Sequence, residues 1–264
     1  MTLSAEQTAT YGRDGFVLLP GLLDAAEVAT LRNEVARLAK VEDECVFREG
    51  EAGTAKTMFR MHEADGPTAS APFHALAHAP RALGAARRVL GDDALYLHHS
   101  KVNMKGAVQG SVWPWHQDFG SWYLDGIAAP DMTTLMVMLD ASEPFNGCLY
   151  FLPGSHKGGR IEPYRDESTA YKLWSVPPAQ MRALLDEGPE PVAIGGKPGD
   201  GALFHCNLVH ASGHNLSARD RWQAYFCYNR VANRPADVDQ PRPDYVRSTN
   251  WTSMALTDDA RVAA

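Results

Sequence analysis

Beyond Asp93, the chain alternates short β-prone segments with turns rich in glycine and proline and with long excursions. The densest turn is Gly195–Gly201, in which Asp200 is expected to shape the backbone rather than to bind a ligand. Short strands separated in this way are typical of a double-sheet jelly roll or a barrel. We therefore predict a mainly β fold with flanking α-helices. The expected strands span residues 95–105, 132–140, 148–152, 191–194, 202–206 and 221–231.

The N-terminal third is predicted to be mostly helical. Ser4 with Gln7, and Asp24 with Glu27, have the spacing of capping boxes and indicate two helix starts. The polar segment 45–68 is interpreted as a loop, because it lacks a clear hydrophobic period. The other expected elements are helices over 4–15, 24–41, 71–90 and 177–187 and a short strand over 15–20.

The length of 264 residues favours one large domain over two. We expect a single domain over 1–264, with a helical part over about 1–92, a jelly-roll core over about 93–231 and a C-terminal surface wrap over about 232–264.

The net charge of −7 argues against nucleic acid as a partner and leaves a small cationic or zwitterionic ligand possible. No apolar run approaches the length of a membrane span, and no signal-peptide pattern begins the sequence. The four cysteines form no C-x-x-C pair, so we expect reduced, mostly buried thiols in a cytoplasmic protein. Both a monomer and a homodimer fit these features.

The stretch Trp113–Gly120 contains a His-x-Asp pair, His116 and Asp118. If the stretch is a strand running into a loop, the two side chains project to the same side. A neutral imidazole and a carboxylate, joined by a second imidazole, form the facial triad of non-heme Fe(II) oxygenases. The sequence therefore predicts that this stretch supplies two of the three protein ligands of a metal site.

Three histidines after the glycine-rich turn are candidates for the third ligand: His205, His210 and His214. His210 follows the end of a predicted strand and is well placed to reach the mouth of a barrel. Arg221 opens the next strand, so we expect His210 and Arg221 to lie side by side on adjacent strands. Structural roles are favoured for His62, His74, His78 and His98, four of the histidines that precede this turn.

An ordered set of four segments makes the resemblance to a known family specific. The segments are Trp115–Trp122, Pro144–Gly147, Phe151–Lys157 and His210–Asn215 followed by Arg221. They resemble the phytanoyl-CoA dioxygenase-like family of Fe(II)- and 2-oxoglutarate-dependent oxygenases, which have a double-stranded β-helix (a cupin-like jelly roll). The similarity is greatest to the branch that contains ectoine hydroxylase and free-amino-acid hydroxylases.

This resemblance implies that His116, Asp118 and His210 bind Fe(II), with no catalytic residue beyond these ligands. It implies that 2-oxoglutarate and O2 are co-substrates, with succinate and CO2 released. Arg221 would bind the distal carboxylate of 2-oxoglutarate through a bidentate contact. The other implied 2-oxoglutarate residues are Ser212, Asn103 and Trp113, and the implied substrate residues are Trp122, Lys101 and His99.

The sequence differs from ectoine hydroxylases at His99, where they usually have Gln, and at Lys101, where they usually have Arg. We therefore expect hydroxylation of a small polar metabolite, a free amino acid or related zwitterion, that need not be ectoine. Asp118 favours hydroxylation over halogenation, because related halogenases lack this carboxylate. The alternatives are desaturation, epimerisation or aminophosphonate oxidation at the same site, or a non-catalytic β-barrel that binds metal or a small ligand.

The segment from Ser155 to Ser175 is long and charged and contains tyrosine. Long loops of this kind often cover active sites. We expect it to act as a lid.

Overall fold

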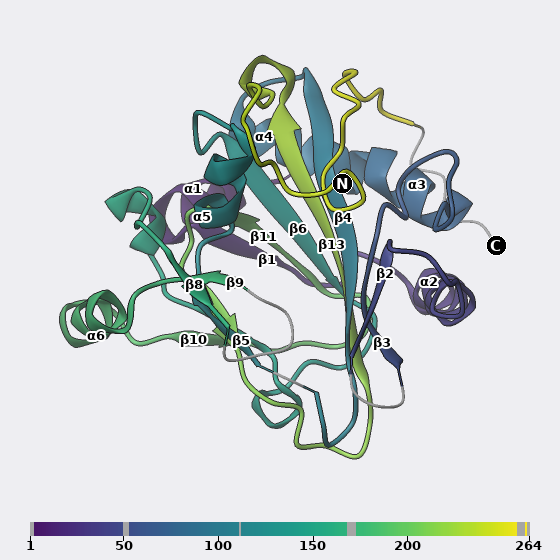
Figure 1. The fold of residues 1–264 in the computed structure, drawn as a ribbon, viewed down its shortest axis with the longest axis horizontal. Helices are drawn as coiled ribbons and strands as arrows, with labels where there is room; N and C mark the ends of the chain where they lie inside the picture. Colours follow the sequence, from purple (N-terminus) through teal and green to yellow (C-terminus); the bar gives the residue numbers. More distant parts are fainter. Residues whose placement is uncertain (1–2, 50–52, 111, 168–172, 258–261, 263–264) are drawn as a thin grey trace.

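The structure, a computed structural model, describes residues 3–49, 53–110, 112–167, 173–257 and 262. Its largest unit is a seven-stranded antiparallel sheet with the order β1-β11-β6-β13-β4-β3-β2 (Figure 1). The strands of this sheet are β1 (Phe16–Leu19), β2 (Val46–Glu49), β3 (Thr54–Phe59), β4 (Leu95–Lys105), β6 (Met132–Met138), β11 (Gly201–His205) and β13 (Arg221–Arg230).

A four-stranded antiparallel sheet forms the second unit, with the order β10-β7-β12-β5. Its strands are β5 (Trp113–His116), β7 (Leu149–Phe151), β10 (Val192–Ile194) and β12 (His210–Ser212). A small hairpin of β8 (Tyr164–Asp166) and β9 (Leu173–Ser175) adjoins it. One buried cluster joins the two larger sheets, because it contains Met136, Phe204 and Tyr225 from the first and Leu149 and Phe151 from the second. The predicted jelly roll is therefore present.

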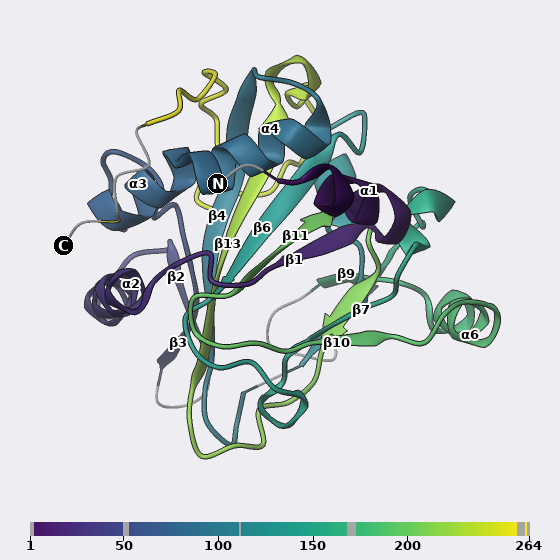
Figure 2. The same ribbon diagram turned by 180° about the vertical axis from the view of Figure 1, so that it is seen from behind.

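Helices cover the outer face of the seven-stranded sheet, as Figure 2 shows for α1, α3 and α4. The main hydrophobic cluster lies between these helices and the sheet. The helices are α1 (Ala5–Asp14), α2 (Ala25–Leu38), α3 (Ala71–His78), α4 (Ala85–Leu90), α5 (Asp118–Trp122) and α6 (Pro178–Glu187). The shorter helical turns are η1 (Pro80–Gly84), η2 (Tyr123–Asp125), η3 (Pro144–Asn146), η4 (Ser155–Gly158) and η5 (Val231–Asn233).

Both predicted capping boxes form. Ser4 and Gln7 bond reciprocally at the start of α1, and Asp24 and Glu27 do so at the start of α2. The expected helix over 71–90 is interrupted, because Pro80 has no backbone N–H to donate and the chain passes through η1 before α4 begins.

The prediction that 45–68 is a loop was wrong, because β2 and β3 lie within it. β3 adds to β4 through the pairs Thr57–Asn103 and Phe59–Lys101, so sheet extension outweighs the polar composition of the segment. The buried lysine of β3, Lys56, forms an ion pair with Glu49 of β2. A periodicity argument treats such a lysine as solvated, and therefore misses the strand.

Candidate metal centre and active-site cavity

His116, Asp118 and His210 form a compact group with three ligand atoms within 4.8 Å of one another. The two imidazoles lie opposite each other across β5 and β12, with ring centroids 4.1 Å apart. The nearer Asp118 oxygen, Oδ1, is 3.8 Å from His116 Nε2 and 3.9 Å from His210 Nε2. All three residues are buried. Asp118 is the first residue of α5 and not part of a loop, so the predicted strand-to-loop transition is a strand-to-helix transition.

The hydrogen bonds of the two imidazoles fix which nitrogen faces the group. His116 Nδ1 lies 2.7 Å from the carbonyl of Pro114, and His210 Nδ1 lies 2.9 Å from the carbonyl of Leu208. A carbonyl only accepts, so each Nδ1 carries the proton and each Nε2 keeps its lone pair for a metal. Burial, followed by the neighbouring His210, lowers the pKa of His116 to about 3, which keeps this ligand neutral.

Asp118 stays ionised although it is buried. Burial alone would raise the pKa of its carboxyl, but His210 and the ammonium of Lys101 outweigh that effect and the net shift is downward. The hydroxyl of Thr134 lies at the long limit of hydrogen bonding, 3.5 Å from Asp118 Oδ2. Two neutral imidazoles and one carboxylate are the donor set of a two-His-one-carboxylate iron site.

A cavity of about 220 Å³ opens at this group. The predicted substrate residues His99, Lys101 and Trp122 all line it, together with Trp113. The Lys101 ammonium lies 5.3 Å from the ring centroids of both Trp113 and Tyr225, a cation–π arrangement that directs it inward from β4. The remaining lining residues beside the metal group are Phe59, Ser121, Arg165, Trp174 and Arg242.

A β-bulge shapes one wall of this cavity. On β4, His99 pairs with Cys227 and Leu97 pairs with Tyr228, so His98 is an extra residue. The imidazoles of His98 and His99 therefore stack at 5.9 Å, and each meets the edge of Trp122 at 5.5 Å. Neither nitrogen of His99 has a hydrogen-bond partner among the described residues, although the residue is buried. His99 thus offers one donor and one acceptor at the cavity wall.

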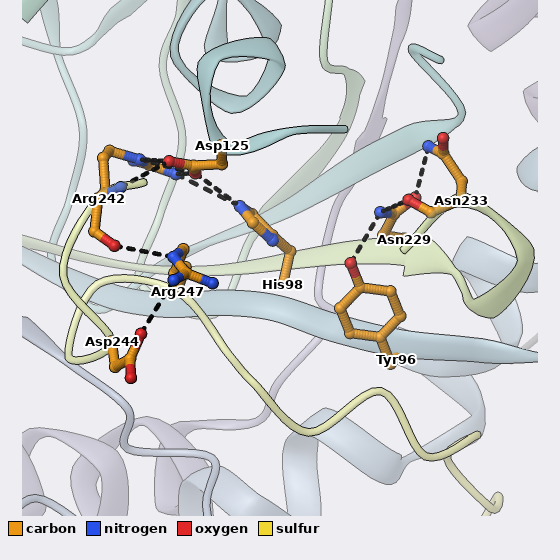
Figure 3. Close-up of polar contacts among 8 residues, drawn as sticks. All are labelled: Tyr96, His98, Asp125, Asn229, Asn233, Arg242, Asp244 and Arg247. Atoms are coloured by element: carbon orange, nitrogen blue, oxygen red, sulfur yellow. Dashed lines mark hydrogen bonds and ion pairs between the residues drawn. The ribbon is translucent and has the colours of Figure 1, made fainter. Parts of the chain in front are cut away.

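The C-terminal segment supplies another cation to the same wall. Figure 3 shows the Arg242 side chain against Asp125, with Nη2 2.5 Å from Oδ2, and His98 Nε2 lies 3.4 Å from the same oxygen. Burial raises the pKa of Asp125, but Arg242 more than reverses this, so the pair is ionic. The expected surface wrap therefore contributes to the cavity, which sequence analysis did not predict.

Arg221 does not line this cavity. It is buried at the start of β13, and its Nη2 donates to the carbonyl of Gly147 at 2.7 Å. Nη1 donates to Gln223, and Nε has no partner in the part of the chain that the structure describes. The expected adjacency of His210 and Arg221 was wrong, because β12 and β13 belong to different sheets. Arg221 instead pairs in register with Lys105 of β4.

Lys105 is a second buried cation that sequence analysis missed. Its Nζ donates to Ser212 Oγ at 2.8 Å and to the carbonyl of Gly213. Burial, together with Arg221 and Lys56, lowers the pKa of Lys105 to about 6. Among the described residues, neither Lys105 nor Arg221 forms an ion pair with a carboxylate. A guanidinium and a lysine amine that are buried without an ion-pair partner are costly to charge, so this region is suited to an anionic group that would stabilise their charged forms.

Asn103 and Trp113 connect the two regions. Both line a narrow second cavity together with Lys105, and Trp113 lines the metal cavity as well. Asn103 is buried and accepts a hydrogen bond from Thr57. Lys101, Asn103 and Lys105 alternate along β4, and Lys105 pairs with Arg221 of β13, so one strand runs from the metal cavity to the two buried basic side chains.

The family model described as Phytanoyl-CoA dioxygenase (PhyH) matches residues 11–222. The chain belongs to the phytanoyl-CoA dioxygenase family. An ectoine dioxygenase of Nocardia farcinica is 32% identical over 95% of this chain and 87% of that protein. An L-proline trans-4-hydroxylase of Streptomyces griseoviridis is 33% identical over 96% of this chain and 95% of its own length.

Solved structures agree with this family assignment. EctD from S. alaskensis, with 2-oxoglutarate and 5-hydroxyectoine, aligns with a TM-score of 0.85 at 29% identity, over 99% of this chain and 89% of that one. The same protein with bound Fe aligns with a TM-score of 0.83. The prediction of a jelly roll of this family is confirmed. No helix in the described ranges has the length and apolar character needed to cross a membrane.

Proposed function

We propose that the protein is an Fe(II)- and 2-oxoglutarate-dependent dioxygenase that hydroxylates a C–H bond of a small amino-acid-like metabolite. The observation that carries this proposal is the buried group of His116, Asp118 and His210, with both Nε2 lone pairs and one carboxylate directed to a common point. Iron bound there supplies the oxidative chemistry, in which 2-oxoglutarate is converted to succinate and CO2.

The roles of the protein groups follow from their positions. His116, Asp118 and His210 would hold the metal at the wall of the cavity, where co-substrates could reach it. Arg221, Lys105 and Ser212 would hold the distal carboxylate of 2-oxoglutarate. Arg221 and Lys105 are buried and pair on adjacent strands, and the Lys105 amine bonds the Ser212 hydroxyl. Asn103 and Trp113 would line the path of the carbon chain.

The substrate cavity supports a carboxylate-bearing zwitterion. Its volume of about 220 Å³ suits a free amino acid and is small for a carrier-bound acyl group. Lys101 and Arg242 would attract a substrate carboxylate, and the face of Trp122 suits an ammonium group. His99, held neutral by burial, would select a polar group by one hydrogen bond.

A screen of amino acids and small zwitterions tests the function directly. The expected result is Fe(II)-dependent succinate formation that one class of substrate stimulates, with a product 16 mass units heavier (about one oxygen atom) by mass spectrometry. A product two mass units lighter (about two hydrogen atoms) would indicate desaturation, and an unchanged mass would indicate epimerisation. Succinate formation stimulated by an aminophosphonate would indicate that the enzyme oxidises aminophosphonates. Metal binding without succinate would leave a non-catalytic barrel.

We further propose a cytoplasmic enzyme that acts as a monomer or homodimer through one domain over 1–264, without nucleic acid or membrane partners. The four cysteines support a reducing compartment, because all are free and buried. The segment 155–175 would close over the cavity as a lid. Arg165 and Trp174 from its hairpin line the cavity, and residues 168–172 lie outside the described ranges.

A further inference from the structure

A third cavity, of about 450 Å³, lies between α3, the loop after β3 and the C-terminal segment. No residue that lines it also lines the cavity at the metal group. Three histidines face it: His74 and His78 from α3, and His62 from the loop. The function proposed above makes no use of this cavity.

His74 and His78 repeat two features of the pair His116 and His210. Their ring centroids are 4.5 Å apart, against 4.1 Å at the metal group, because positions i and i+4 lie on one face of a helix. In each pair, every Nδ1 is bonded to a backbone carbonyl. His74 Nδ1 lies 2.7 Å from the carbonyl of His62, and His78 Nδ1 lies 2.8 Å from that of Ala255.

These carbonyls fix the tautomer of both rings. A backbone carbonyl accepts but never donates, so in the neutral form of each ring Nδ1 carries the proton and Nε2 carries a lone pair. Neither Nε2 has a hydrogen-bond partner in the described structure, and both side chains are only partly buried. Ligating histidines typically donate their other N–H to a carbonyl or carboxylate in this way.

We propose that His74 and His78 form a second divalent transition-metal site, of the Zn²⁺ class, distinct from the site of Fe(II). Imidazole nitrogen suits zinc, copper, nickel and cobalt, and two histidines at i and i+4 on a helix can bind one such ion. Within the described ranges, only His116, Asp118 and His210 bring three ligand atoms within 4.8 Å. The second site therefore provides two protein ligands and leaves the other positions to water.

The surroundings connect this site to the C-terminal segment. The carbonyl of Ala255 fixes the His78 ring, and the backbone N–H of Thr257 donates to the carbonyl of His78. The same segment carries Arg242 to the substrate cavity. A metal ion on α3 would hold the His78 ring in place and stabilise the docking of this segment. Asp65, which lines the same cavity, is available as an outer carboxylate.

Zn²⁺ binding can be measured without interference from the iron site. The starting protein is the full chain with His116→Ala and His210→Ala, which removes both imidazoles of that site. Equilibrium dialysis with atomic emission is expected to find one bound Zn²⁺ per chain. Adding His74→Phe, which keeps a ring on the helix but removes its lone pairs, is expected to weaken binding at least about tenfold. His78→Phe is expected to do the same.

His214→Phe is the matched control, because His214 also bonds a carbonyl through Nδ1 but has no histidine ring against it in the described structure. It should leave Zn²⁺ binding unchanged. Electron paramagnetic resonance of Cu²⁺ bound to the starting protein needs no substitution in α3. Its spectrum is expected to show two coordinated imidazole nitrogens, one from each histidine of the proposed site. No Zn²⁺ bound to the starting protein, or binding that both Phe variants leave unchanged, would overturn the proposal. Thermal melting should also rise with Zn²⁺ in the starting protein and not in the His74→Phe form.

Discussion

Under the proposed function, Lys105 is expected to make the binding of 2-oxoglutarate dependent on pH. The surrounding protein lowers the pKa of its ammonium to about 6, with burial as the largest cause. A carboxylate bound beside Lys105 favours the charged form and raises that pKa again. At any pH between the Lys105 pKa of the free protein and that of the complex, the binding of 2-oxoglutarate takes up one proton. We therefore expect the affinity for 2-oxoglutarate to fall as the pH rises above about 6.

The size of this effect follows from the pKa shift. Each pH unit above the pKa adds about 1.36 kcal/mol to the cost of charging Lys105, which is about tenfold in affinity. At about pH 7.5, the cost is on the order of 2 kcal/mol relative to a pKa of about 6. Lys105→Met removes the titration and one charge-assisted hydrogen bond worth roughly 1.5–3 kcal/mol, so its affinity should be lower at pH 6 and nearly independent of pH.

Anaerobic calorimetry with Fe(II) and 2-oxoglutarate, from about pH 6 to 8, measures this dependence. Lys101→Met is the matched control, because Lys101 lies on the same strand and faces the substrate cavity. It should retain the wild-type dependence. A slope that survives in Lys105→Met, or a wild-type affinity that rises with pH, would refute the assignment of Lys105.

Four further outcomes are expected. Arg221→Ala should raise the KM for 2-oxoglutarate roughly 30- to 150-fold, equivalent to about 2–3 kcal/mol of binding free energy, and should change the KM of the primary substrate far less. Equal changes in both KM values would show that Arg221 does not bind 2-oxoglutarate. The double substitution His99→Gln with Lys101→Arg should raise activity on ectoine relative to wild type in a succinate assay. If activity on ectoine does not rise, these two positions do not determine the substrate specificity. Lys105→Met should be more stable to urea than wild type near pH 7.5, because the unfolded chain binds more protons at any pH between the folded pKa of about 6 and the ordinary lysine pKa of 10.5. The upper limit of the gain is about 4 kcal/mol, and a loss of stability would contradict the pKa shift. Hydrogen exchange over 155–167 should slow when Fe(II), 2-oxoglutarate and substrate bind, and unchanged protection would count against a lid.

The helix starts and most strands could be predicted because their signals are local. Ser4 and Asp24 each mark a helix start together with a residue three positions later, and the turn over 195–201 separates two strands. Asp200 accepts hydrogen bonds from the backbone of Gly21 and Lys197, which is the turn role expected for it.

The residues that sequence analysis missed depend on long-range packing. Lys105 is recognisable only once β4 is placed beside β13, although its spacing from Lys101 and Asn103 was a usable signal: residues two apart on a strand share a face. Arg242 reaches the cavity through an ion pair with Asp125, 117 residues away in sequence. The bulge that brings the His98 and His99 rings against Trp122, with His99 at the cavity, has no sequence signature of its own.

Diffraction at the iron absorption edge, from crystals grown without oxygen and soaked with Fe(II) and 2-oxoglutarate, tests the central claim most directly. We predict one anomalous peak within bonding distance of His116 Nε2, His210 Nε2 and Asp118, with the distal carboxylate of 2-oxoglutarate against Arg221 and Lys105. The absence of a peak at this group, or a carboxylate that lies away from both Arg221 and Lys105, would contradict the account.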